Sequence, residues 1–154
     1  MRAPYAAVTL TLVTVAVSSL LEAAPSIGRL RANGTPRAEY TATLAGRDGR
    51  KVTGAATARP TADGKGTEVT VTLDGDTPGA TRPWHVHSGS CKQSGGVVGG
   101  GRAYTPIAID AKGQGKGTAN IPVTLADTAT YYVNIHDAAA AMGIIVACGD
   151  LTKK

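Results

Sequence analysis

The sequence predicts an all-β fold, a sandwich or barrel of Greek-key type. The 154 residues include 20 glycines, 8 prolines, one tryptophan and no phenylalanine, with many threonines and valines. This composition favours short strands joined by turns. Eight strand-like runs follow one another at turn-bounded intervals, without a helical period longer than two turns. The length suits one domain.

The predicted strands rest on alternation of apolar and polar residues and on the turns between them. In EVTVTL the apolar residues Val69, Val71 and Leu73 point to one face, which we assign to the core. Asp48-Gly49 stands where a hairpin turn is expected between the first two runs. The predicted strands are residues 38–45, 52–59, 68–73, 84–87, 104–110, 117–125, 130–136 and 144–148.

Two connections between these strands have distinct compositions. Residues 88–102 are rich in serine and glycine and are expected to form a loop. Within them, GGVVGGG at 95–101 resembles a phosphate loop only in its glycines, because no Lys-Ser/Thr and no helix follow. Residues 138–142 are expected to make one helical turn.

The N-terminal segment has the layout of a secretory signal peptide. Arg2 precedes an apolar run over residues 6–21, and small residues follow up to Pro25. A membrane anchor, the alternative, needs roughly 20 apolar residues and a charged flank, and this run is shorter. We therefore predict a signal peptide over residues 1–24, a flexible leader over 25–37, a domain over 38–154, and a secreted or periplasmic protein with no membrane contact after cleavage.

The charge distribution and the two cysteines limit the kinds of function that the sequence can support. The net charge of +5 is scattered, and no basic run interleaves with aromatic residues, so nucleic acid is not an expected partner. Cys91 and Cys148 are the two cysteines of the chain. In an exported protein they indicate a disulfide rather than a metal pair or a catalytic thiol. The sequence does not indicate an oligomeric state.

The three histidines are candidate metal ligands. His85 and His87 would project from one face of a strand about 6.6 Å apart, given a rise of about 3.3 Å per residue. His136 ends another predicted strand, and all three lie near the cysteines in sequence. Surface or hydrogen-bonded histidines are the alternative. Imidazole suits copper, zinc and nickel, so the spacing does not choose the metal. Three nitrogens leave a coordination position open, as in reactive sites.

Three sequence segments resemble the copper/zinc superoxide dismutase family. PWHVHSGSC at 83–91 is similar to its copper-binding segment, YVNIH to the strand with its last copper histidine, and GIIVACGDL at 143–151 to its Gly-x-Arg-x-Ala-Cys-Gly ending. The likeness covers about residues 38–151. It implies one copper ion on His85, His87 and His136, a Cys91–Cys148 disulfide, an eight-stranded Greek-key barrel and dismutation of superoxide to oxygen and hydrogen peroxide.

The sequence also departs from this family. Residues 92–102 contain no His, Asp or Glu, so no zinc site is expected, and the chain resembles a copper-only version. Ile145 stands in place of the family's active-site arginine. Arg82 or Arg102 could compensate for that charge, and Asp137 could deliver protons. A copper-dependent dismutase, a non-catalytic copper-binding protein and a metal-free structural module therefore remain as alternatives.

Overall fold

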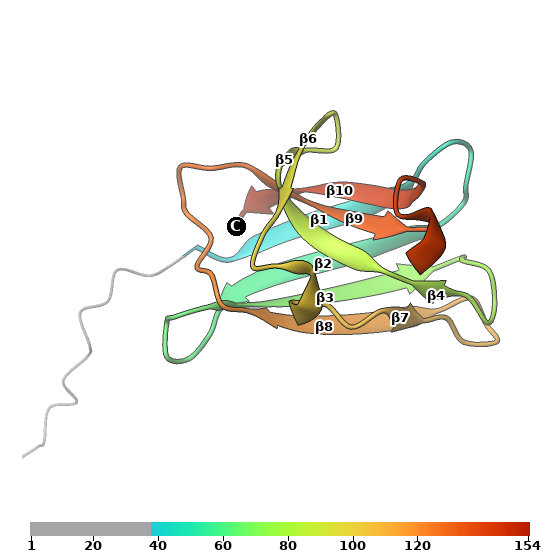
Figure 1. The fold of residues 1–154 in the computed structure, drawn as a ribbon, viewed down its shortest axis with the longest axis horizontal. Helices are drawn as coiled ribbons and strands as arrows, with labels where there is room; N and C mark the ends of the chain where they lie inside the picture. The colour runs from blue at the N-terminus through green and yellow to red at the C-terminus, as the bar shows by residue number, and fades with distance from the viewer. Residues whose placement is uncertain (1–37) are drawn as a thin grey trace, which may run out of the picture. The chain divides into compact units, whose positions relative to one another are not determined.

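The structure is a computed structural model that describes residues 38–154. The predicted signal peptide (1–24) and leader (25–37) lie outside these residues. The described part consists of strands and two short 3-10 helices (Figure 1). The elements are β1 Tyr40–Gly46, β2 Thr53–Pro60, β3 Thr67–Asp74, β4 Thr81–Arg82, β5 Trp84–Ser90, β6 Gln93–Val97, η1 Gly101–Ala103, β7 Ile107–Ala108, β8 Gly115–Ile121, β9 Tyr131–His136, η2 Ala139–Ala141 and β10 Ile145–Lys153.

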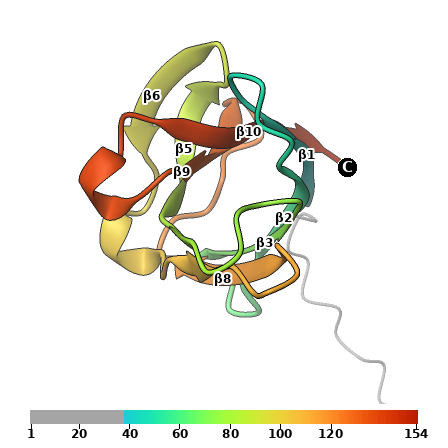
Figure 2. The ribbon, with the colours of Figure 1, turned by 90° about the vertical axis from the view of Figure 1, so that its right-hand side faces the viewer.

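Eight strands form one antiparallel sheet, in the order β6-β5-β9-β10-β1-β2-β3-β8. The sheet curls around its core (Figure 2), and β4 pairs separately with β7. Three connections join strands that are not neighbours in the sheet, from β3 to β5, from β6 to β8 and from β8 to β9, as in Greek-key folds. The predicted all-β class and the eight-stranded architecture are confirmed.

Apolar side chains from alternate strand positions fill the concave side of the sheet. Val69, Val71 and Leu73 on β3 are buried, as predicted. Trp84 and Val86 on β5 join the same core. This alternation leaves the intervening residues of β5 on the opposite, outer face of the sheet.

The first hairpin turn lies at the predicted residues. Asp48 and Gly49 have φ values of 53° and 78°, and the Arg50 N–H donates to the Arg47 carbonyl at 3.0 Å. Two consecutive positive φ values are typical of a type I′ turn, whose twist suits an antiparallel hairpin. The predicted helical turn at 138–142 is also present, as η2.

Several segments differ from the prediction. The run expected as a strand at 104–110 contains only the two-residue β7, and β8 covers residues 115–121 in place of 117–125. Residues 93–97, expected as loop, form the edge strand β6, which pairs with β5. Its glycines and serines give no alternation, because the whole strand is exposed. The last strand, expected at 144–148, continues to Lys153 because it pairs with β1 as well as with β9. Among the described residues, no helix is long and apolar enough to cross a membrane.

Candidate metal centre

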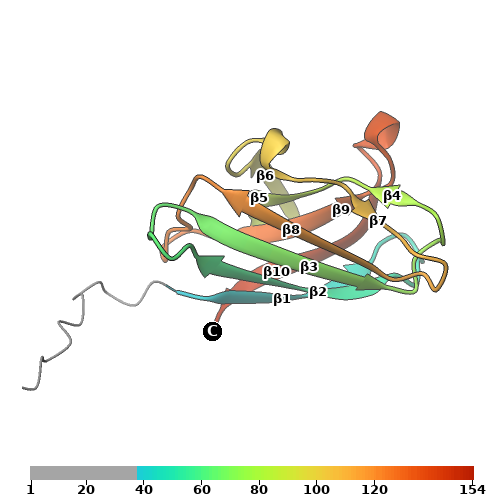
Figure 3. The same cartoon turned by 90° about the horizontal axis from the view of Figure 1, so that it is seen from below.

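Neighbouring strands bring the three histidines together on the outer face of the sheet. His85 and His87 alternate with the core residues of β5, and His136 ends β9. The two strands are antiparallel, with His85 opposite Asn134. Figures 2 and 3 show η1 and η2 on this outer side. The structure therefore places all three predicted ligands in one cluster.

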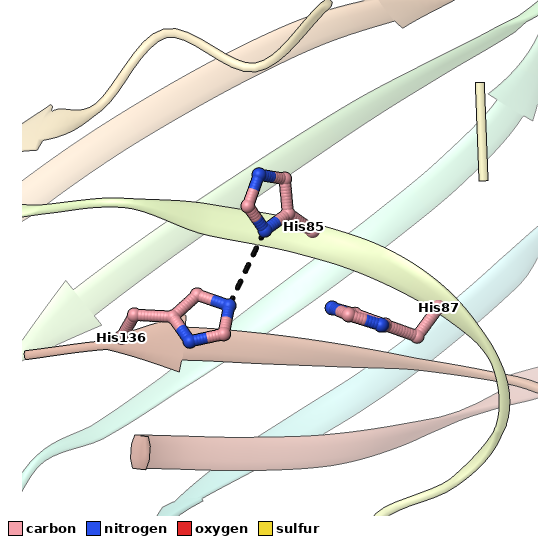
Figure 4. Close-up of side chains that lie close together, drawn as sticks. All are labelled: His85, His87 and His136. Atoms are coloured by element: carbon pink, nitrogen blue, oxygen red, sulfur yellow. Dashed lines mark hydrogen bonds between the residues drawn. The ribbon is translucent and has the colours of Figure 1, made fainter. Parts of the chain in front are cut away.

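The imidazole nitrogens converge on one small space (Figure 4). One ring nitrogen from each histidine lies within 4.8 Å of the other two. The closest pair is His85 Nδ1 and His136 Nε2, at 3.2 Å. Two nitrogens bound to one tetrahedral metal at about 2.0–2.1 Å are about 3.3 Å apart. The separation of this pair thus suits ligands that share an ion.

Backbone carbonyls orient two of the three rings. His87 Nδ1 lies 3.0 Å from the Gly95 carbonyl oxygen, and His136 Nδ1 lies 2.6 Å from that of Met142. Since a carbonyl only accepts, both Nδ1 atoms carry the proton, and each Nε2 offers a lone pair. That of His136 accepts a hydrogen bond from His85 Nδ1 at 3.2 Å, whereas that of His87 has no partner. Metal-binding histidines use this arrangement, in which the second ring N–H is held by an outer partner.

The Nε2 atom of His87 is buried without a hydrogen-bond partner. A buried polar atom left unpaired raises the free energy of the folded state by about 1–3 kcal/mol. A metal ion at the convergence point would pair with this lone pair. The orphaned nitrogen and the all-imidazole donor set therefore fit a metal ion, and imidazole donors alone do not discriminate copper from zinc or nickel.

Burial and mutual repulsion favour the neutral imidazoles. Burial is the largest cause that lowers the pKa of His85, to about 4, and the charged forms of His136 and His87 lower it further. Burial also lowers the pKa of His136, against the opposing effect of its hydrogen bond to Met142. Near neutral pH these two ligands therefore hold lone pairs without competition from protons.

Two tyrosines that sequence reasoning missed pack against the histidines. Tyr132 stacks on His87 with ring centroids 5.1 Å apart, and Tyr104 meets His85 edge-on at 5.2 Å. Burial raises the pKa of Tyr104 to about 12, so its hydroxyl stays protonated and donates to Val98. Strand alternation could have identified Tyr132, because it lies four residues before His136 on the same face of β9.

A main-chain segment lies close to the His85 ring, the one that no carbonyl orients. A Cβ atom on Gly101, in η1, would lie 3.5 Å from His85 Nε2. Arg102 is the next residue and is exposed. Of the two arginines considered from the sequence, Arg102 is therefore the one that is exposed and that follows a residue close to His85.

The other two candidate auxiliary residues are paired with each other. Arg82 is buried and forms ion pairs with Asp76 and Asp137. Its guanidinium is therefore not available to attract an anion to the histidines. The Asp137 carboxylate, considered as a proton donor, accepts a hydrogen bond from Arg82 at 2.7 Å instead.

The predicted disulfide is present and joins the β5–β6 hairpin to β10. Cys91 and Cys148 are bonded, with their Cα atoms 6.0 Å apart. The Cys91 N–H also donates to the Asp150 carboxylate at 2.6 Å. The disulfide is compatible with an extracytoplasmic location.

No protein-family model matches the sequence, and no curated protein matches it. The resemblance to copper/zinc superoxide dismutases therefore remains a prediction.

Proposed function

We propose that this protein is an exported copper-binding protein that dismutes superoxide at a single copper ion. The observation that carries the proposal is the convergence of one ring nitrogen each from His85, His87 and His136 to within 4.8 Å of one another. Two of these rings are already oriented by carbonyl groups. The segments PWHVHSGSC and GIIVACGDL, which resemble the dismutase family, support copper as the metal and superoxide as the substrate.

Copper would supply a one-electron couple that oxidises one superoxide to oxygen and reduces the next to peroxide with two protons. The protein's own contribution is to hold three imidazoles, which serve both oxidation states of copper. Three ligands leave a position open for a small anion. Arg102, exposed beside Gly101, is the candidate to attract that anion by its charge.

A non-catalytic copper-binding role is the second candidate. It is favoured by the pairing of Arg82 with Asp76 and Asp137, which removes two groups that could assist turnover. Ile145 also stands where the dismutase family has its arginine. In this role the protein would buffer or carry copper outside the cytoplasm. A metal-free structural module is the third candidate, and the orphaned His87 Nε2 argues against it.

One experiment distinguishes the three. The purified oxidised protein is loaded with Cu(II), excess metal is removed, and superoxide consumption is measured beside His85→Ala. We expect one copper per chain and consumption well above the variant. Retained copper with a rate equal to that of the variant would support the binding role. Failure of the wild-type protein to retain copper would leave only the metal-free module.

Export is the remaining part of the proposal. The predicted signal peptide over residues 1–24 would direct the chain to the periplasm or the medium. The Cys91–Cys148 disulfide supports this, because such bonds persist in oxidising compartments. Mass spectrometry of the mature N-terminus should find cleavage near Pro25. An intact N-terminus in the cytoplasmic fraction would contradict export.

A further inference from the structure

The guanidinium of Arg82 is the most strongly held charged group near the histidines. Its residue is 5% exposed. Nε and Nη2 donate to the two carboxylate oxygens of Asp76 at 2.8 and 2.6 Å. Nη1 donates to the carbonyl and carboxylate oxygens of Asp137, at 2.6 and 2.7 Å. We call Asp76, Arg82 and Asp137 the arginine latch.

The arginine latch joins the two segments that carry the histidines. Arg82 lies three residues before His85, and Asp137 directly follows His136. The main chain is joined at the same place, because the His136 N–H donates to the Pro83 carbonyl at 2.8 Å. The side-chain and main-chain bonds together set the end of β9 against the start of β5.

Asp137 also begins the loop that orients His136. Its N–H donates to the Ile144 carbonyl at 3.0 Å, which closes residues 137–144 into a loop. That loop contains Met142, whose carbonyl accepts the Nδ1 proton of His136. A displacement of Asp137 would therefore move both the backbone of His136 and the acceptor that sets its ring.

The other end of the arginine latch is anchored in a well-bonded turn. The Asp76 N–H donates to the Gly113 carbonyl at 3.1 Å, in the turn between β7 and β8. The Asp76 carboxylate also accepts from the Thr77 N–H at 2.7 Å. A Cβ on Gly113 would lie 2.6 Å from the Asp76 carbonyl oxygen, so the two segments are in close contact. Arg82 therefore connects Asp137 to Asp76, whose own position is fixed by these contacts.

Stability alone is a weak reason for such a buried charged group. Replacement of a buried ion pair by well-packed apolar residues is often neutral or stabilising. The planar fork of arginine, in contrast, sets distance and direction at both partners at once. An arrangement that holds geometry suits a neighbouring site whose function depends on geometry.

We propose that Arg82 is a positioning residue of the metal centre, and that the arginine latch holds His136 and the Met142 loop in the geometry for ligation. This proposal rests on metal binding by the three histidines. Arg82 does not touch the metal. It acts through Asp137, which fixes the backbone next to His136 and the loop that carries its hydrogen-bond acceptor.

The test compares Arg82→Lys and Arg82→Met with a matched control, Arg59→Lys. Lysine keeps the charge without the fork, methionine keeps much of the length without charge, and Arg59 forms an exposed ion pair with Glu39. Each purified chain is titrated with Cu(II) against a competing chelator. Its Cu(II) electron paramagnetic resonance spectrum and thermal midpoint are also recorded.

We expect both Arg82 variants to bind Cu(II) at least about tenfold more weakly, the usual size of an outer-partner effect. We also expect an altered resonance spectrum in both variants and a smaller loss of Cu(II) affinity with lysine than with methionine. Arg59→Lys should change neither affinity nor spectrum. Wild-type affinity and spectrum in a folded Arg82 variant, whatever its midpoint, would overturn the proposal and leave Arg82 a purely structural residue.

A metal-free measurement separates this proposal from the proposed function and covers variants that fold poorly. Asp137→Asn keeps the carbonyl that Arg82 also contacts, weakens one bond of the arginine latch and removes the ion pair of Asp137 with Arg50. In its apo form, and in apo wild type, nitrogen NMR of the His136 ring reports the Nδ1–H bond to Met142. We expect this resonance to shift or broaden in Asp137→Asn. An unchanged resonance would contradict the proposal. A shifted resonance in a protein whose wild type fails to bind copper would instead defeat the proposed function and show that the arginine latch orients His136 without a copper ion to bind.

Discussion

The Tyr132 hydroxyl and the His87 Nε2 atom are both buried without hydrogen-bond partners, and their rings stack on each other. A metal ion on the three histidines, as proposed, would pair with the orphaned nitrogen. The hydroxyl has no such partner, and its ring already contributes by stacking on His87. The buried phenol oxygen of Tyr132 therefore lowers the free energy of unfolding, because no hydrogen bond compensates for its loss of water.

The substitution Tyr132→Phe removes this unpaired oxygen. We expect Tyr132→Phe to leave the free energy of unfolding unchanged or raise it by up to about 1–3 kcal/mol, because a buried unpaired hydroxyl is removed and the stacked ring is kept. Urea denaturation of the metal-free protein measures it. A loss of more than about 1 kcal/mol would mean that the hydroxyl has a partner after all, such as a buried water.

Asp76 gives a prediction about pH. Burial favours its neutral form, but hydrogen bonds from Arg82 and the Thr77 N–H, with the charge of Arg82, outweigh burial and lower its pKa below the ordinary 3.8. A carboxyl with a lowered folded-state pKa stabilises the fold above its unfolded-state pKa, and this contribution is lost as pH falls through the folded-state pKa.

We therefore expect the stability of the wild-type protein to fall below about pH 4. Asp76→Asn should show a shallower fall there, together with a loss of about 3–5 kcal/mol at neutral pH because Arg82 loses a buried partner. Chemical denaturation at several pH values checks both. Parallel pH profiles for the two proteins would contradict the assignment to Asp76.

The three candidate histidines could be predicted from the residue pattern, whereas the arginine latch could not. His85 and His87 share a face because strand alternation is local, and His136 stands at the end of an obvious strand. The partners of Arg82 lie 6 and 55 residues away, and only the strand arrangement joins them. The sequence therefore suggested Arg82 and Asp137 as free site residues, whereas folding pairs them.

At the scale of the elements, strands with a buried face were predictable and the exposed edge was not. In β3 the alternation of Val69, Val71 and Leu73 reflects a core on one side. Exposed β6 has no such constraint, so its Ser-Gly composition resembles a loop. Yet β6 matters for the site, because its Gly95 carbonyl orients His87.

The disulfide connects this edge hairpin to β10, and its removal should affect both stability and site. We expect a Cys91→Ser, Cys148→Ser double variant to lose about 4 kcal/mol, the chain-entropy value for a separation of 57 residues. We also expect weaker Cu(II) binding, since the hairpin with Gly95 is held less firmly. Denaturation curves and chelator competition measure the two effects. Unchanged affinity would show that β5–β6 pairing alone orients His87.

For the whole molecule, a metal ion that binds only the folded state should stabilise it by linkage. At free Cu(II) 100 times the dissociation constant, we expect about 2.7 kcal/mol of added stability. Thermal unfolding with and without metal measures this, and His136→Ala serves as the control that should not respond. An equal response of both proteins would indicate binding elsewhere.

The alternation along β5 has a further consequence for how accurately the protein can assemble. Trp84 and Val86 enter the core from the same strand that presents His85 and His87 outward. A pairing slip of one residue would exchange the two sets, exposing the tryptophan and burying two imidazoles among apolar side chains. Correct packing of Trp84 in the core therefore also fixes the strand register that places His85 and His87 on the outer face.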